Sequence, residues 1–277
     1  MLIDKKVTDL LDAFASPDPT PGGGSAAALA GAVGASLLAM VAGLPKTKTG
    51  TPEERAALDE ARATLLKHRQ SLVELVDRDA GAYDQVVAAF RLPKETPEEK
   101  AARTNAIQRG MEAATTVPVE TLQECARAIT AGRTVAEFGN PSAKSDLAVA
   151  MQLLMGGVQG AMFNVMANIG SLKDAAFVDR VKANVQAAQA ECGESLGRAY
   201  QAAGVFEMMQ QAAQVLGPPN LHPKGEAEAQ PQHLAKLIAM MLGRLGTAEA
   251  RRALEALAQS ADPAMRTAAS DTLAKLT

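Results

Sequence analysis

The chain has 277 residues, enough for one large domain or two small ones, and its formal charge is −3, which excludes the basic surface of a nucleic-acid-binding protein. Aromatic residues make up only 3% and Trp is absent, which favours closely packed helices over sheets. The N-terminus lacks the apolar region of a signal peptide. Cys125 and Cys192 are not in a C-x-x-C unit, so we expect core thiols in a cytoplasmic protein.

A short amphipathic helix is predicted over residues 7–14, and the Pro-rich link 16–21 ends it. Pro21-Gly22-Gly23-Gly24-Ser25 then leads into a run of small residues. We expect the glycines to form a turn, because glycine escapes the usual steric limits on the backbone, and Ser25 to cap the next helix. Two rows of small residues at a spacing of four predict that this helix is central and buried: Ala27, Gly31, Ala35, Ala39 and Gly43, and Ala26, Ala30, Gly34 and Ala42.

Other interpretations of this stretch compete. The glycines can be a tight turn and nothing more, or the helix start can present free N–H groups to an anionic ligand. A dinucleotide-binding fingerprint is rejected, because the link 16–21 contains three prolines and cannot be the strand that this fingerprint requires. A membrane span over Ser25–Leu44 is disfavoured, since the run is mostly Ala and Gly and we find no second span. We therefore expect no membrane contact.

The helices that follow are predicted from their caps and apolar periodicity, and we find no strand pattern. Thr51 and Thr96 each precede a proline and two acids, the signature of a helix start. Pro118 is expected to begin or kink a helix. The predicted ranges are 52–90, 97–115, 118–131, 146–169 and 174–216, with a non-periodic stretch over 132–145.

Residues 1–216 are thus predicted to form one all-α domain, followed by a polar linker over 217–232 and a helical appendage over 233–277. The linker begins with Gly217-Pro218-Pro219, which stops the preceding helix. The appendage is expected to contain three short helices, and its last two resemble one HEAT-like hairpin. One such repeat cannot bury its own face, so we expect it to dock on the body, on another subunit or on a protein partner.

Three sets of polar residues near predicted loops are the candidates for chemistry. Asp79 lies one helical turn from both Leu75 and Tyr83, so it shares the apolar side of its helix. A carboxyl group there needs a partner or has a raised pKa, which a general acid or base requires. The three sets are Gly22 to Ser25; Asp77, Asp79, Tyr83 and Asp84, with Lys94 shortly after; and Asn140, Ser145 and Asp146.

Each candidate has a purely structural alternative. Asp79 can be paired with a buried Arg or Lys, and Asp146 can be a helix cap that interacts favourably with the helix dipole. The chain has three histidines, and none lies at a metal-binding spacing from another possible metal ligand, so we expect no metal site.

The three sets, in this order, resemble the cyclodeaminase/cyclohydrolase family. This family includes the C-terminal domain of formiminotransferase-cyclodeaminase and free-standing bacterial methenyltetrahydrofolate cyclohydrolases. The resemblance covers about residues 1 to 205 and is strongest over 11–42, around the Pro21–Ser25 unit. The tail beyond about Gly217 departs from the family. Similar groups also fall at Asp79 with Tyr83, at Leu92-Pro93-Lys94, at Ala114 with Val117-Pro118, and at Gly139-Asn140 with Ser145-Asp146.

The resemblance implies an up-and-down helical bundle of the cyclodeaminase type, assembled as a cytoplasmic homodimer. It implies a tetrahydrofolate derivative as substrate, either 5-formimino- or 5,10-methenyl-tetrahydrofolate, with no further cofactor. Asp79 is expected to transfer the proton, with Lys94 and Asp146 helping to place the folate. The expected catalytic residues are Asp79 and Lys94, and the expected substrate-binding residues are Gly22, Gly23, Gly24, Ser25, Tyr83, Asn140, Ser145 and Asp146.

A second hypothesis belongs to a different class. The chain can be a non-catalytic binding or scaffold protein that retains the fold and interacts through its HEAT-like tail. A change in the absorbance of a folate on mixing with the protein distinguishes the two hypotheses.

Overall fold

The computed structural model describes residues 1–45, 50–216, 248–259 and 263–275, and every regular element within these ranges is helical. The chain divides into two compact units, residues 1–203 and 204–277, which are described separately. The all-α prediction is confirmed. The elements are η1 (Leu2–Asp4), α1 (Val7–Ala15), α2 (Gly23–Gly43), α3 (Pro52–Phe90), α4 (Pro97–Phe138), η2 (Pro141–Ala143), α5 (Lys144–Ile169), α6 (Ala175–Ala202), α7 (Val205–Leu216), α9 (Ala248–Leu257) and α10 (Pro263–Leu273).

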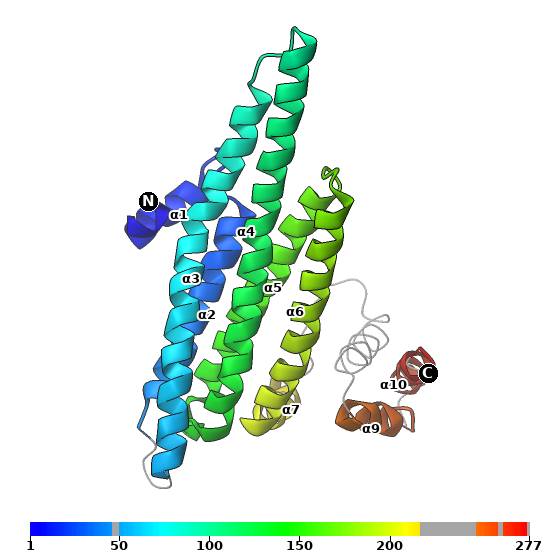
Figure 1. The fold of residues 1–277 in the computed structure, drawn as a ribbon. Helices are drawn as coiled ribbons and strands as arrows, with labels where there is room; N and C mark the ends of the chain where they lie inside the picture. The colour runs from blue at the N-terminus through cyan, green and yellow to red at the C-terminus, as the bar shows by residue number, and fades with distance from the viewer. Residues whose placement is uncertain (46–49, 217–247, 260–262, 276–277) are drawn as a thin grey trace. The chain divides into compact units, whose positions relative to one another are not determined.

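The first unit is built around α2. This helix packs against α3, α4 and α5, and α4 packs in addition against α6. The long helices from α2 to α6 run alternately up and down, as Figure 1 shows. The predicted up-and-down bundle with a central small-residue helix is therefore confirmed.

The small residues of α2 let neighbouring helices come close to it. A Cβ atom at Gly31 would lie 2.5 Å from Sγ of Cys125 in α4, and one at Gly34 would lie 2.8 Å from the carbonyl oxygen of Ala150 in α5. Cys125 and Cys192 are free, buried thiols, as predicted, and burial raises the pKa of both. The glycine spacing thus serves helix packing in the middle of the bundle.

The starts of α3 and α4 are the two that the sequence indicates most clearly. Thr51 and Thr96 each accept a hydrogen bond from the backbone N–H three residues later, at Glu54 and Glu99. The two Glu side chains accept hydrogen bonds from the backbone N–H of the capping threonines, which completes a capping box in both helices. The hairpin that α3 and α4 form extends beyond the ends of α2 and α5 (Figure 1).

The predicted break before Pro118 is wrong, because α4 continues from Pro97 to Phe138 and takes in half of the stretch expected to be non-periodic. Proline has no N–H, so the carbonyl group of Ala114, four residues earlier, loses its partner within the helix. The side chain of Asn168 in α5 donates a hydrogen bond to this carbonyl at 2.9 Å. A neighbouring helix thus supplies the missing donor, and α4 remains continuous.

The single helix predicted over 174–216 is also wrong. It is divided into α6 and α7 at Gly204, whose φ of 66° is in the left-handed region that favours glycine. The first unit ends at Ala203, whereas the sequence placed the end of the body at residue 216.

In the second unit, α9 and α10 pack together around Leu254, Ala268 and Ala269. These are two of the three helices expected in the appendage. The first one, over 233–245, and the linker 217–232 lie outside the described residues. The likeness of the tail to a HEAT repeat stays a prediction.

Two helical segments are long and apolar enough to cross a membrane, Gly23–Gly43 and Pro141–Ile169. Only the first of these two was considered as a span from the sequence. Because α2 packs against three other helices, its place at the centre of the bundle accounts for its apolar composition. The absence of membrane contact stays an expectation.

Candidate functional site

The site is centred on Asp79, a half-buried residue of α3 that faces the first turn of α2. Within the described part of the chain, no Lys or Arg forms an ion pair with Asp79, so the structural alternative of a buried pair does not apply there. The carboxyl group instead meets Ser25 of α2. The central helix therefore begins directly against a carboxyl group that carries no compensating positive side chain.

Ser25 holds Asp79 in place. Its hydroxyl group lies 3.0 Å from Oδ2 of Asp79 and 2.9 Å from the carbonyl oxygen of Val76, and its backbone N–H also bonds to Asp79. The prediction that Ser25 caps α2 is wrong, because Gly22 is the N-cap and Ser25 lies fully buried within the first turn. Its hydroxyl group therefore bonds to two groups of α3, the carbonyl oxygen of Val76 and the carboxyl group of Asp79.

Of the glycines before Ser25, Gly24 is needed for space, and the predicted turn that requires glycine backbone freedom is not found. None of them has a positive φ in the structure. A Cβ atom at Gly24 would lie within 2.7 Å of Cγ and both oxygens of Asp79. At Gly23 the nearest atom would be Nδ2 of Asn164 in α5, at 3.6 Å, which is ordinary contact. Of these two positions, only Gly24 must therefore be glycine, because a side chain there would collide with the carboxyl group of Asp79.

The pKa of Asp79 is raised above its ordinary value because burial removes water from its charged form. The two hydrogen bonds from Ser25 oppose this effect and lower the pKa, but burial is the larger cause. When Asp79 is protonated it can donate to the Ser25 hydroxyl group, which then donates to the Val76 carbonyl. When Asp79 is ionised, Ser25 can turn its proton toward the carboxylate. The hydrogen bonds of Ser25 thus accommodate both protonation states of Asp79, which is required of a group that gives and takes a proton.

The raised pKa predicts how Asp79→Asn changes stability with pH. A carboxyl group with a raised pKa in the folded state lowers stability as the pH rises from its unfolded value, about 3.9, through its folded value. Asn cannot ionise, so the stability of the variant relative to the wild type should increase over this interval and then level off. Urea unfolding at several pH values measures the difference. Parallel curves for the two proteins would contradict the prediction, and Asp84→Asn, at an exposed position of α3, is the control.

Tyr83 and Lys94 do not contact Asp79 or Ser25 within the chain. Tyr83 lies one turn beyond Asp79 on α3 but is 42% exposed, so its predicted place on the inner face is wrong. Lys94 is exposed in the turn between α3 and α4. The eleven residues from Asp79 to Phe90 rise roughly 16 Å along α3, at 1.5 Å per residue, which places Lys94 well away from the carboxyl group.

The third predicted set lies at the opposite end of α2. The side chain of Asn140 donates to the carbonyl oxygen of Pro45, just after α2, and accepts from the N–H of Ser142. Ser145 and Asp146 occupy the first turn of α5, beside it. The helix from Gly24 to Leu44 rises roughly 30 Å, so this set lies far from Asp79 within the chain.

Sequence reasoning missed Asn164. It lies beside Gly23, and its amide donates to the carbonyl oxygen of Gly160 one turn earlier. Its Oδ1 remains available as an acceptor next to the start of α2. A usable signal was present, since Asn164 and Asn168, together with Gln159, are the polar residues in a C-terminal half of α5 that is otherwise apolar or small.

Over the described residues the fold is all-helical, and its site places a half-buried carboxyl group with a raised pKa against the start of the central helix. The chain belongs to the formiminotransferase-cyclodeaminase family, whose model matches residues 6–187. A methenyltetrahydrofolate cyclohydrolase of Methylorubrum extorquens is 37% identical over 198 residues, which are 72% of this chain and 95% of the relative.

Longer relatives match through one part of their chains. The formimidoyltransferase-cyclodeaminase of Rattus norvegicus is 34% identical over 181 residues, which are 65% of this chain but only 34% of the relative. Among solved structures, formiminotetrahydrofolate cyclodeaminase from Thermotoga maritima superposes with a TM-score of 0.66 at 22% identity. The match covers 75% of this chain and all of that chain, and it shows that the fold is shared.

Proposed function

We propose that the protein is a tetrahydrofolate one-carbon enzyme that acts as a methenyltetrahydrofolate cyclohydrolase. The observation that carries the proposal is the raised pKa of Asp79, held by Ser25 at the start of the central helix. The relative that aligns over 95% of its own length, and so resembles the free-standing body of this chain, has that activity in its name. We expect a cytoplasmic enzyme, and we expect it to need no cofactor, because hydrolysis of the methenyl group requires only water and proton transfers.

The residues at the site account for each proton in this reaction. Water adds to the methenyl carbon between N5 and N10, and the carboxylate of Asp79 takes the proton that the water loses. The bond from this carbon to N5 then breaks, and the carboxylic acid of Asp79 gives its proton to N5. The hydroxyl group on the carbon then gives its proton to the Asp79 carboxylate and becomes the formyl oxygen, which gives 10-formyl-tetrahydrofolate, and Asp79 releases this proton to the solvent. Asp79 takes and gives protons in turn, and a raised pKa serves these steps.

Formiminotetrahydrofolate cyclodeamination is the second candidate, and the similarity to the bifunctional relatives favours it. In this reaction N10 adds to the formimino carbon, and its proton passes to the imino nitrogen, which becomes an amino group. The bond from the carbon to this amino group then breaks, which gives 5,10-methenyl-tetrahydrofolate. Ammonia is a poor leaving group unless it receives a proton, which the carboxylic acid of Asp79 can donate. The same site geometry therefore serves both reactions.

Assays of purified protein with both substrates decide between these activities. Loss of the absorbance of 5,10-methenyl-tetrahydrofolate reports cyclohydrolase, and its appearance from 5-formimino-tetrahydrofolate reports cyclodeaminase. Turnover of neither substrate would refute the enzyme and favour the scaffold alternative, in which the second unit binds a protein partner.

We expect Gly22, Gly23, Gly24, Ser25 and Tyr83 to line the folate site. Lys94 and the set of Asn140, Ser145 and Asp146 stay predicted substrate contacts. Their distance from Asp79 within one protomer means that they can reach the same substrate only if a second copy supplies them or if the substrate is extended.

A homodimer is the assembly that we propose. Large apolar side chains stand exposed on α2 and α5, two helices that pack against each other: Val33, Met40, Val149, Phe163 and Met166. Phe163 is 64% exposed and Met166 is 61% exposed. The two side chains are three residues apart, so they are neighbours on one helix face, and exposed apolar patches of this kind mark interaction surfaces. A second copy that presents the same face would cover both sets by two-fold symmetry.

The dimer predicts a light-scattering mass of about twice the chain mass of 28.7 kDa at micromolar concentration. Phe163→Asp should shift the protein toward the monomer, because it places a charge in the covered face. Lys182→Asp, at an exposed position of α6, is the control and should remain dimeric. A wild-type protein that is monomeric at these concentrations would contradict the prediction.

A further inference from the structure

The helix α1 has an apolar and acidic surface that the rest of its unit leaves uncovered. Leu10 is its one buried residue, and within the described part of the chain α1 packs extensively against no other helix. Val7 is 73% exposed and Leu11 is 58% exposed. At 100° per residue, Leu11 and Asp12 both lie on the half of α1 that faces away from Leu10. The outward half of α1 therefore offers an apolar side chain and a carboxylate together.

The place of α1 is set at both of its ends. Before the helix, the backbone N–H of Leu2 donates a hydrogen bond to Asp77 of α3. After it, the link 16–21 leads directly into the start of α2. Figure 1 shows α1 beside α3, at the end of the bundle where α2 begins. Its outward half is thus presented from a fixed position.

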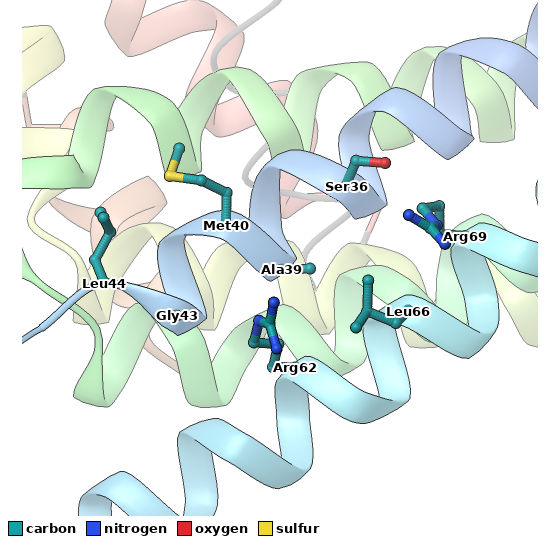
Figure 2. Close-up of a pocket in the computed structure, with 8 residues that line it drawn as sticks. All are labelled: Ser36, Ala39, Met40, Gly43, Leu44, Arg62, Leu66 and Arg69. Atoms are coloured by element: carbon teal, nitrogen blue, oxygen red, sulfur yellow. The ribbon is translucent and has the colours of Figure 1, made fainter.

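A groove lies at the other end of α2. This open pocket of about 370 Å³ is formed by the C-terminal half of α2 and the N-terminal half of α3. Arg62 and Arg69 of α3 lie on either side of Leu66, and Met40 of α2 is an apolar side chain on the facing wall, as Figure 2 shows. We call this pocket the arginine groove. No residue of α1 lines it within the same chain.

The two guanidinium groups of the arginine groove have no partner in the described part of the chain. Arg62 and Arg69 form no ion pair or hydrogen bond there, and Nε of Arg69 is buried without an acceptor. Arg55, seven residues before Arg62, differs because it bonds to Asp59 and to the carbonyl oxygen of Ala42. A buried donor without an acceptor is costly, so the groove is suited to an acidic group supplied by another molecule.

The exposed face of α5 indicates how two copies would be oriented. Val149 and Phe163 are both exposed, and each is seven residues from Gly156, so the three lie on one face. A Cβ atom at Gly156 would meet no described atom within 4 Å, which leaves room for a second helix there. If two α5 helices cross antiparallel at Gly156, Val149 of each copy faces Phe163 of the other. A two-fold axis at this crossing places the start of α2 in one copy opposite the end of α2 in the other.

We propose that α1 of each copy docks in the arginine groove of the other copy. The inference rests on the proposed homodimer and adds a second, charged contact to its apolar face. Leu11 packs against Met40 and Leu66 of the second copy, and Asp12 accepts hydrogen bonds from its arginines. Met40 belongs to the exposed apolar face and to the groove, so the two contacts form one continuous surface. Two-fold symmetry makes the exchange reciprocal, and both arginine grooves are filled.

A disulfide cross-link tests this contact directly. In the double variant Leu11→Cys with Met40→Cys, mild oxidation should link two chains, and a non-reducing gel should show a band of twice the chain mass. The native thiols Cys125 and Cys192 are buried and do not compete. Leu11→Cys with Lys67→Cys is the matched control and should remain unlinked, because Lys67 is exposed on another face of α3. A double variant that stays unlinked, or that closes its disulfide within one chain, would overturn the inference.

Charge reversal tests the acidic half of the contact without cysteines. Asp12→Arg and Arg62→Asp should each raise the dissociation constant of the dimer about tenfold, because each variant breaks two symmetry-related pairs and creates repulsion in their place. The combined variant should recover most of the loss. Both side chains are exposed, so the variants should fold, and Lys67→Asp is the control for charge alone. Sedimentation at several protein concentrations measures the dissociation constant.

The outcomes separate this inference from the proposals on which it rests. Single reversals that leave the dissociation constant unchanged, or a combined variant that recovers nothing, would overturn the docking of α1 while the dimer remains. A monomeric wild type would overturn the dimer and the docking together. Folate turnover does not enter either measurement, so an active enzyme whose chains are not linked would overturn this inference and leave the proposed function intact.

Discussion

Asp79→Asn should lower turnover by about a hundred- to ten-thousand-fold, the usual contribution of a general acid–base group, and should change substrate affinity little. The amide has nearly the shape of the carboxyl group and can still bond to the Ser25 hydroxyl group, which lies 3.0 Å from Oδ2 in the wild type. It cannot take a proton from water or give one to N5 or to leaving ammonia. The loss should therefore appear in kcat with both folate substrates.

Absorbance assays at saturating substrate measure this effect, and Asp84→Asn provides the control on the same helix because its side chain is exposed. Near-normal turnover of Asp79→Asn with both substrates would show that the acid is elsewhere. Asp146, the carboxyl group in the first turn of α5, would then be the next residue to replace.

Gly24→Ala should be nearly as damaging to catalysis, although it adds only one methyl group. The new Cβ atom would lie within 2.7 Å of Cγ and both oxygens of Asp79, so the carboxyl group must rotate away from Ser25. Misplacement of a catalytic group by about 1 Å can cost a hundredfold in rate. Overpacking of this kind lowers the free energy of unfolding by roughly 1–3 kcal/mol, and the better helix propensity of Ala offsets part of that loss.

Gly23→Ala is the matched control for this prediction. Its Cβ atom would meet Nδ2 of Asn164 at 3.6 Å, which is ordinary van der Waals contact, so turnover should stay close to that of wild type. The pair of variants separates the requirement for space at Asp79 from a general need for glycine in the first turn of α2. Equal losses from both variants would contradict the role given to Gly24.

Local signals in the sequence were enough for much of the fold. The capping boxes at Thr51 and Thr96 depend on residues three positions apart, so they can be read without knowing what packs nearby. The small residues of α2 predicted its central place, because small side chains allow neighbouring helices to pack closely against a helix on several sides. The position of Asp79 one helical turn from Leu75 predicted either a charged partner or a raised pKa. The structure shows Leu75 buried, and burial is the main cause of the raised pKa of Asp79.

The sequence by itself thus determined the helical class, the main helix starts, the central helix and the candidate acid, because each follows from contacts within a few residues. The tertiary structure alone decided that α4 passes through Pro118, since the replacement donor, Asn168, is 54 residues from the carbonyl group of Ala114. It likewise decided that Ser25 holds Asp79, 54 residues away, and that Gly24 makes room for the carboxyl group. It also separated Asn140 and Asp146 from Asp79 by the length of α2. These outcomes depend on which faces of distant helices meet, and no spacing along the chain encodes that.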